Sequence, residues 1–206
     1  MLLPIYNTDG LCEAGCDEAG RGCLAGSVYA AAVILPPDYH NEWLNDSKQL
    51  SARRRYALRE QIEREAVAWA VGVVTPDEID KINILNASIL AMHRALDALS
   101  VRPEFVIVDG NRFKNYGETP WKTIVKGDGK YLSIAAASIL AKTYRDDYMK
   151  KLHAEYPYYG WDHNAGYPTR EHRDGIAAHG LTPYHRRSFR QLAEGQMELF
   201  SPEDFG

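Results

Sequence analysis

LCEAGCDEAGRGCLAGSVYAAAVIL, residues 11–35, contains two apolar stretches with a glycine-rich interval between them. The first eight residues mix small and apolar side chains, and the last nine form a β-rich apolar run that ends before a Pro-Pro pair. Both stretches are typical of strands, and the glycines between them are typical of a turn. The segment therefore predicts two consecutive strands, the first of which contains the adjacent acids Asp17 and Glu18.

The rest of the chain alternates strand-like runs with helical patterns. Further strands are predicted at 67–74, 105–108 and 121–126. Helices are predicted from an N-cap at Ser51 to about Glu65, from about Asn83 with an apolar face of Leu85, Ile89, Met92, Leu96 and Leu99, at 131–153, and near 169–179. This order predicts an α/β fold in which helices pack on a mixed sheet.

The composition indicates a soluble globular protein. The chain has 206 residues, of which 45% are hydrophobic and 25% charged, enough for one domain with a real core. It has no run of 18 apolar residues and no signal-peptide pattern, so we expect no membrane association. Cys12, Cys16 and Cys23 are an odd number within twelve residues, which favours a reducing cytoplasm and buried thiols over disulfides or zinc.

The net charge of −4 by itself disfavours a nucleic-acid partner, but the acidic residues are unevenly distributed along the chain. Residues 191–206 hold four of the 28 acidic residues and no Lys or Arg, so the rest of the chain carries 24 acidic and 24 basic residues. If several of those acids bind metal ions, the remaining surface is effectively basic. Local patches, rather than total charge, decide whether phosphates are attracted.

Four carboxylates lie where the predicted elements can bring them together. Asp17 and Glu18 are adjacent, Asp109 ends the apolar run FVIV, and Asp128 lies within GDG just before the long predicted helix. Two like charges 4 Å apart repel by roughly 4 kcal/mol at an intermediate dielectric, and hard cations with oxygen ligands relieve that repulsion. Two such ions can activate water and stabilise the leaving oxygen of a phosphodiester. The pattern favours a metal-dependent nuclease over ordinary surface acids.

Six segments resemble, in order, motifs of the ribonuclease HII family. They are DEAGRG (17–22) with LAG (24–26), DSKQLS (46–51), VDG (108–110), KGD (126–128) followed by SIAAASILAK (133–142) and RD (145–146), GYPT (166–169) with His172, and HRRSF (185–189). The resemblance covers roughly residues 11–190. Cys23 stands where the family usually has Pro, and Tyr131 lies where Ser is common, which puts only local loop shape in question.

The resemblance to this bacterial type 2 ribonuclease H family implies a ribonuclease H-like α/β fold. That fold has a five-stranded mixed sheet flanked by helices and a helical C-terminal part, here from about residue 155 of a single catalytic domain, 1–190. It implies an endonuclease that hydrolyses RNA in RNA–DNA hybrids and nicks duplex DNA 5′ of embedded ribonucleotides during replication and repair. The family uses Mg²⁺ or Mn²⁺ and leaves a 3′-hydroxyl and a 5′-phosphate.

The resemblance also implies roles for single residues. It assigns Asp17, Glu18, Asp109 and Asp128 as metal ligands, Gly20, Arg21 and Gly22 as the loop that senses the ribose 2′-hydroxyl, and Tyr167 as the ring that stacks on the sugar beyond the RNA–DNA junction. The 2′-hydroxyl is the group that separates RNA from DNA at one nucleotide. A glycine loop allows close backbone contact with it, and a site built for a hydroxyl rejects substrates that lack one.

Several basic residues are candidates for phosphate contacts. Lys48, Lys142, Arg145 and Arg187 are predicted to hold substrate phosphates, with a solvated helix face as the alternative for Arg145. Residues 53–55 form an Arg run that more often marks a solvated face. The sequence leaves open whether His185, Arg186, Arg187 and Arg190 form a phosphate-facing patch. His163 and His172 are disfavoured as metal ligands, because a site of acids that binds Mg²⁺ prefers oxygen.

The acidic tail, 191–206, contains a peptide of separate interest. QMELF, residues 196–200, resembles the short Gln-x-x-Leu-Phe peptide by which bacterial DNA-processing proteins bind the sliding clamp. Gln196, Leu199 and Phe200 are the predicted partner-binding residues. The alternatives are a disordered acidic end and a helix end that packs its apolar residues on the body.

Two other functions compete with the main prediction. A ribonuclease HIII-type enzyme would share the fold, but such proteins usually carry a large N-terminal substrate-binding domain, and about ten residues precede the first predicted strand here. A catalytically silent hybrid-binding module is disfavoured because all four acids are present. We expect a cytoplasmic enzyme, and nothing in the sequence demands more than a monomer.

Overall fold

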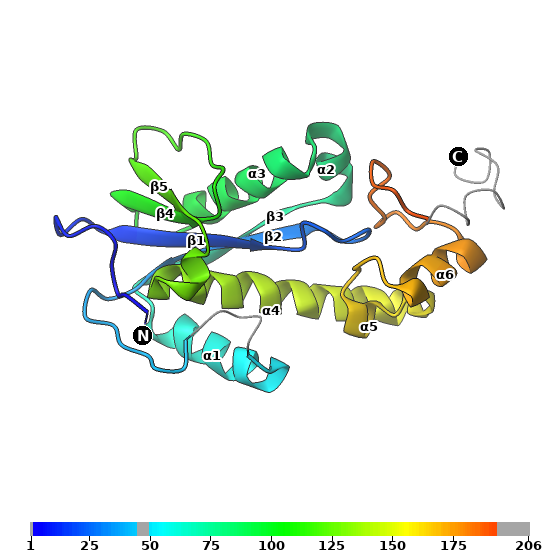
Figure 1. Ribbon diagram of the computed structural model, residues 1–206, viewed down its shortest axis with the longest axis horizontal. Coiled ribbons are helices and arrows are strands. Elements are labelled where there is room, and N and C mark those ends of the chain that lie inside the picture. The colour runs from blue at the N-terminus through cyan, green and yellow to red at the C-terminus, as the bar shows by residue number, and fades with distance from the viewer. Residues whose placement is uncertain (1, 45–49, 193–206) are drawn as a thin grey trace.

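In the computed structural model, which describes residues 2–44 and 50–192, five strands form one mixed sheet in the order β3-β2-β1-β4-β5 (Figure 1). The strands are β1 (Glu13–Ala19), β2 (Val28–Ile34), β3 (Ala68–Val74), β4 (Phe105–Asp109) and β5 (Trp121–Ile124). β2 pairs antiparallel with β1 and β3, whereas β1 and β4, and β4 and β5, are parallel pairs. The predicted five-stranded mixed sheet is confirmed.

Helices cover both faces of the sheet. α2 (Pro76–Ile82) and α3 (Ile84–Asp97) lie on one face, and α1 (Ala52–Glu65) and the long α4 (Leu132–Glu155) lie on the other (Figure 1). The 3-10 turn η2 (Gly127–Gly129) precedes α4, and η3 (Pro157–Tyr159), α5 (Trp161–Asn164) and α6 (Arg170–His179) follow it. The helical C-terminal part is therefore confirmed, and it lies at the far end of α4 (Figure 1).

Helix starts follow the predicted caps. Ser51 caps α1 by accepting the N–H of Arg54, and Asn83 caps α3 by accepting the N–H of Asn86. Leu85 was predicted on the apolar face of α3 but is 37% exposed, so that face begins further along the helix.

The apolar periodicity did not predict α2, because seven residues are too few to repeat an apolar face. Its signal is local. The Thr75 side chain accepts the N–H of Glu78, the Glu78 carboxylate accepts the N–H of Thr75, and Pro76 occupies the first helical position. This reciprocal cap satisfies two donors that the first helical turn would otherwise leave without partners.

β1 contributes side chains to both faces of the sheet. Ala14 and Cys16 pack in the apolar layer under α3, whereas Gly15 faces α4. A Cβ on Gly15 would come within 2.4 Å of the carbonyl carbon of Ser133, so only glycine lets α4 lie this close to β1. The same face of β1 carries Asp17, which therefore also lies beside α4.

All three cysteines are free, and Cys16 and Cys23 are buried. The prediction that they form no disulfides is confirmed. Within residues 2–44 and 50–192, no helix is both long enough and apolar enough to cross a membrane.

Candidate active site

Asp17, Glu18 and Asp109 meet where β1 and β4 end side by side. The parallel register pairs Cys16 with Val108, so the next residues, Asp17 and Asp109, are neighbours on one face. Cys16 and Val108 pack in the layer under α3, which turns Asp17 and Asp109 toward α4. Two strands far apart in the sequence thus deliver carboxylates to one edge of the sheet.

β1 keeps regular pairing through both of its acids, with Asp17 opposite Ala31 and Glu18 opposite Ala30. Strand alternation therefore starts the two side chains from opposite faces of the sheet, but at the end of β1 both line the same pocket. Asp17 forms a hydrogen bond with the side chain of Ser138 on α4, a contact that the sequence did not predict. Asp109 interacts electrostatically with both acids, because it ends the neighbouring strand β4 beside the end of β1 that carries them.

The three carboxylates concentrate negative charge in a partly closed space. Burial, followed by repulsion from Glu18 and Asp109, raises the pKa of Asp17 well above its ordinary value. Burial also raises the pKa of Glu18, although the Arg21 guanidinium, 3.2 Å from the Glu18 carboxylate, works in the opposite direction. A cation between the carboxylates would offset both the burial and the repulsion.

Asp128, the fourth predicted acid, lies on the turn η2 and is 6% exposed. It is not among the residues that line the pocket of the other three acids. Its neighbour Gly127 donates its N–H to Asp109 Oδ1 at 2.6 Å, so the turn that carries Asp128 is bonded directly to that carboxylate. The structure thus brings three predicted acids together and places the fourth on an adjoining turn.

One pocket joins the acids to residues predicted to recognise the substrate. It is lined by Asp17, Glu18, Ala19, Gly20, Arg21, Gly22, Asp109, Ser138, Lys142 and Tyr167. These residues come from β1, the loop after it, β4, α4 and the segment before α6. Tyr167 is 44% exposed, so its ring is available to a ligand.

The loop after β1 is held from behind by Arg186, which is fully buried. Its guanidinium donates to the carbonyl oxygens of Gly20 at 2.7 Å and Arg21 at 3.0 Å. In a planar trans peptide the N–H points opposite to the C=O. The N–H groups of Arg21 and Gly22 therefore point away from Arg186, and these two residues line the pocket.

Arg145 does not reach the surface, so the predicted phosphate contact is wrong, and so is the solvated-face alternative. It is 2% exposed. Its guanidinium donates to the carbonyl oxygens of Ser27 at 3.0 Å, Ala165 at 2.8 Å and Ala25 at 3.1 Å. The motif residue links the segment just before β2 to the segment just before Tyr167 instead of binding a ligand directly.

The sequence left open whether residues 185–190 form a phosphate-facing patch, and the structure answers this in part. His185 and Arg186 are buried, so neither faces a phosphate. Arg187 is exposed, and its backbone N–H donates to Asp80 Oδ2 at 2.8 Å. Arg186 belongs to the motif segment HRRSF, but the motif does not show whether a residue is buried. Its burial shows that Arg186 supports the loop after β1 and does not contact a ligand at the surface.

Lys142 is half-buried and lines both the acid pocket and a neighbouring hollow that also contains Arg55 and Lys150. Tyr167 is shared in the same way, so the two hollows adjoin. The predicted site residues Lys48, Gln196, Leu199 and Phe200 lie outside the described residues.

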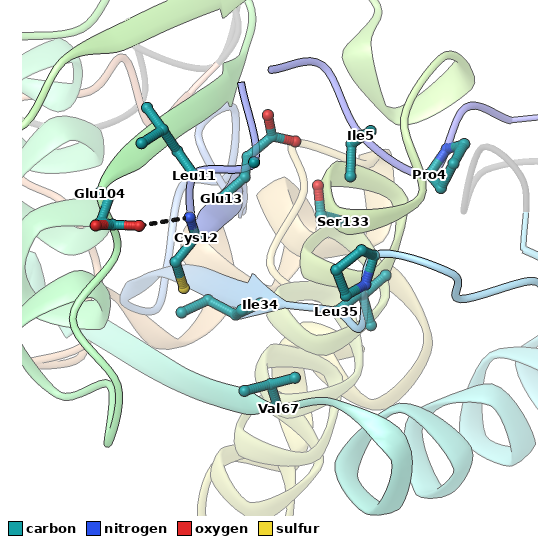
Figure 2. A pocket seen from close by; sticks show the side chains of 12 residues that line it. Pro4, Ile5, Leu11, Cys12, Glu13, Ile34, Leu35, Val67, Glu104 and Ser133 are labelled. Atoms are coloured by element: carbon teal, nitrogen blue, oxygen red, sulfur yellow. Dashed lines mark hydrogen bonds between the residues drawn. The ribbon is translucent and has the colours of Figure 1, made fainter. Parts of the chain in front are cut away.

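A different pocket lies at the opposite end of β1, around Cys12 and Glu13 (Figure 2). Apolar side chains such as Ile5, Leu11 and Ile34 dominate its lining (Figure 2). The Glu13 carboxylate accepts the backbone N–H groups of the N-terminal segment instead of facing other acids. This pocket lacks the chemistry of the acid pocket, which is therefore the candidate active site.

The donor chemistry of the acid pocket fits hard divalent cations such as Mg²⁺ or Mn²⁺. All of its candidate ligands are carboxylate oxygens, and burial opposes their ionised forms unless a cation is present. In the part of the chain that the structure describes, no group of three or more His, Cys, Asp or Glu side chains is already arranged to hold a metal ion.

Solved structures identify the class of protein first. The ribonuclease H2 of Pyrococcus horikoshii has a TM-score of 0.75 and 26% identity, covering 87% of this chain and 94% of that one. The ribonuclease HII of Archaeoglobus fulgidus, solved as a complex with PCNA, has a TM-score of 0.74 and 25% identity, covering 92% and 100%. The fold is therefore that of the type 2 ribonucleases H, as predicted.

The sequence comparisons then identify the family. A sequence model of the family Ribonuclease HII matches residues 14–192. Ribonuclease HII of Bacteroides fragilis is 72% identical over 98% of this chain and 100% of its own, and that of Porphyromonas gingivalis is 57% identical over 94% and 96%. The chain belongs to the ribonuclease HII family, and it is a hydrolase of the ribonuclease H type.

Proposed function

We propose that the protein nicks duplex DNA on the 5′ side of an embedded ribonucleotide and cuts RNA in RNA–DNA hybrids, leaving a 3′-hydroxyl and a 5′-phosphate. The observation that carries this proposal is the single pocket that contains both the acid cluster and the loop after β1. The acids that would bind the metal ions and the loop that would contact the 2′-hydroxyl can then act on adjacent groups of the same nucleic-acid strand.

Asp17, Glu18, Asp109 and Asp128 would hold Mg²⁺ or Mn²⁺ in this proposal. The metal ions, when bound, supply an activated water and stabilise the charge on the leaving oxygen. The Arg21 and Gly22 N–H groups would contact the ribose, and the Tyr167 ring would stack on the following sugar. Lys142 and the exposed Arg187 would hold backbone phosphates, whose contacts position the duplex without reading its sequence.

A ribonuclease HIII-type activity remains the runner-up because the fold is shared. A Bst ribonuclease HIII has a TM-score of 0.66 and 18% identity, and this chain covers 68% of that chain's length. The chain spans the full length of its ribonuclease HII relative from B. fragilis, which favours the HII activity.

The decisive experiment is single-turnover cleavage of a duplex that contains one ribonucleotide. We expect one cut, 5′ of the ribonucleotide, with Mg²⁺ or Mn²⁺, and no cut in EDTA or on an all-DNA duplex. A 3′-hydroxyl on the upstream product is checked by extension with a DNA polymerase. Absence of metal-dependent cutting at the ribonucleotide would overturn the proposal.

The tail supports a second, separable proposal, that this cytoplasmic enzyme works as a monomer tethered to the sliding clamp through Gln196, Leu199 and Phe200. The A. fulgidus relative was solved in complex with PCNA, a sliding clamp.

Deleting residues 195–206 should weaken clamp binding more than tenfold and leave nicking of a short duplex unchanged, because the acid pocket lies entirely outside the tail. The Leu199→Ala, Phe200→Ala double variant should reproduce the loss. A matched Glu203→Ala, Asp204→Ala variant should keep clamp affinity, as measured by surface plasmon resonance. Unchanged affinity for the clamp after the deletion would contradict the proposal that the tail binds it.

A further inference from the structure

Behind Tyr167 lies a buried polar cluster, which we call the histidine cluster and define as Trp161, His172, Thr182 and His185. His172 is fully buried and His185 is 2% exposed. His172 Nδ1 lies 3.0 Å from the carbonyl oxygen of Tyr167. On the other side of the ring, His172 Nε2 lies 3.0 Å from Trp161 Nε1 and 3.1 Å from His185 Nε2.

The partners fix the tautomers of both imidazoles. The indole N–H of Trp161 can only donate, so His172 Nε2 must accept, and the proton of His172 lies on Nδ1. The backbone N–H of Thr182 donates to His185 Nδ1 at 2.9 Å, which puts the proton of His185 on Nε2. His172 Nε2 then accepts from both Trp161 and His185 on its one lone pair, and His172 Nδ1–H donates to the carbonyl of Tyr167.

Both histidines remain neutral in this arrangement. Burial lowers the pKa of His172, and burial together with the neighbouring His172 lowers the pKa of His185 to about 3.

Tyr167 needs such a restraint because the chain before it is bent. Ala165 and Gly166 have positive φ values of 49° and 80°, so two left-handed residues precede the ring. The Tyr167 N–H donates to Asn164 O at 2.9 Å, and its carbonyl accepts from Thr169 N at 2.8 Å as well as from His172. Two contacts tie Tyr167 to buried groups: its carbonyl accepts from His172, and its side chain forms a hydrogen bond with Cys23. The His172 contact is the one that holds the backbone of Tyr167.

The Tyr167 ring lies beside the glycine-rich loop after β1, which we call the glycine loop. A Cβ on Gly22 would meet Tyr167 Cε1 at 3.9 Å, an ordinary contact distance. A small rotation at Gly166 would therefore change the gap between the ring and the loop.

We propose that His172 is a positioning residue that holds the Tyr167 ring at its distance from the glycine loop, and so sets the selectivity for an RNA–DNA junction. The inference rests on the proposed function, since it assigns the junction contact to Tyr167. His172 touches no substrate and acts through the carbonyl of Tyr167.

Two conservative variants separate positioning from general stability. In His172→Asn the amide nitrogen replaces Nδ1 and keeps the donor to Tyr167, but the N–H groups of Trp161 and His185 lose their acceptor. In His172→Gln the amide oxygen replaces Nε2 and keeps that acceptor, but the donor to Tyr167 is lost. We therefore expect the Gln variant to melt higher than the Asn variant, and to be less selective.

Selectivity is the ratio of kcat/KM for a duplex with one ribonucleotide to kcat/KM for a hybrid with an all-RNA strand. We expect this ratio to fall about tenfold in His172→Gln, close to the value of Tyr167→Ala, and to stay within threefold of the wild type in His172→Asn. If selectivity instead follows melting temperature, so that Asn is the worse variant, or if Gln leaves the ratio unchanged, the inference is wrong.

A readout that needs no cleavage separates this inference from the proposed function. Long-range proton–nitrogen NMR spectra should show His172 as the neutral Nδ1–H tautomer. The ring carbon resonances of Tyr167 should shift in His172→Gln but not in His172→Asn. A wild type that cuts nowhere would overturn the proposed function and the junction role, while an Nε2–H tautomer or unmoved Tyr167 resonances would overturn the positioning contact itself.

Discussion

Replacing Asp109 with asparagine should reduce single-turnover cleavage at an embedded ribonucleotide about 100-fold or more, while duplex affinity changes less than about threefold. Asp109 interacts with both Asp17 and Glu18, so it lies at the centre of the cluster. The asparagine oxygen can still accept the Gly127 N–H that Asp109 Oδ1 now accepts at 2.6 Å. The variant thus removes a charge from the metal site while the turn η2 keeps its hydrogen bond.

Binding should survive because the expected duplex contacts come from other residues, such as Lys142 and Tyr167. Fluorescence anisotropy measures affinity in Ca²⁺ or EDTA, and product formation in Mg²⁺ measures cleavage. Asp97→Asn is a matched control, since Asp97 also accepts one hydrogen bond, from Tyr116 at 2.8 Å, but lies outside the pocket. Cleavage by Asp109→Asn at more than a tenth of the wild-type rate would remove Asp109 from the site.

Thermal stability should move in the opposite direction to activity. In metal-free buffer, Asp109→Asn removes one of the charges that repel Asp17, and that repulsion contributes to the raised pKa of Asp17. The variant should therefore melt at or above the wild-type temperature in EDTA, and added Mg²⁺ should stabilise it less than the wild type.

The sequence predicted the acids and the sheet for the same physical reason. An apolar, β-branched run such as FVIV is most stable as a buried strand. An acid that directly follows such a strand must lie at the edge of the sheet. The sequence alone therefore predicts the position of Asp109 at the edge of the sheet. The role of Asp128 as a metal ligand stays a prediction, because its turn packs beside the cluster and it does not line the same pocket.

The arginines were predicted less well, because charge alone does not reveal burial. Arg145 and Arg186 lie in motif segments and were considered as phosphate contacts, yet both donate to backbone carbonyls in the interior. A buried guanidinium needs several acceptors. The segment between β1 and β2 supplies most of them, and Ala165 supplies one more to Arg145. That geometry exists only after the sheet and the C-terminal helices have packed together.

Replacing Gly20 with alanine should damage both stability and activity. Gly20 has φ 94°, where an L-residue is strained by roughly 1–3 kcal/mol. The new Cβ would lie 2.0 Å from Arg145 Nε and 2.7 Å from Arg145 Cζ. Overpacking of this kind costs a further 1–3 kcal/mol, roughly, so the melting temperature should fall by about 5–15 °C.

The activity loss should exceed what the lower stability explains, because Arg145 cannot yield easily. All three of its guanidinium nitrogens donate to carbonyl oxygens, so the loop must move instead, and the Gly20 carbonyl would leave Arg186. The Arg21 N–H turns with that carbonyl, since they share one peptide plane. We expect at least a tenfold loss of cleavage at a ribonucleotide, measured well below the melting temperature.

Gly22→Ala is the matched control for this prediction, because it adds the same methyl group two residues along the same loop. Gly22 lacks a positive φ, and its Cβ would meet only Tyr167 Cε1, at 3.9 Å. Its melting temperature should stay within a few degrees of the wild type. If both variants lose stability equally, the φ strain and the Arg145 contact do not explain Gly20. If Gly20→Ala melts lower but cuts normally at the ribonucleotide, the loop conformation does not govern recognition, and the 2′-hydroxyl must be read elsewhere in the pocket.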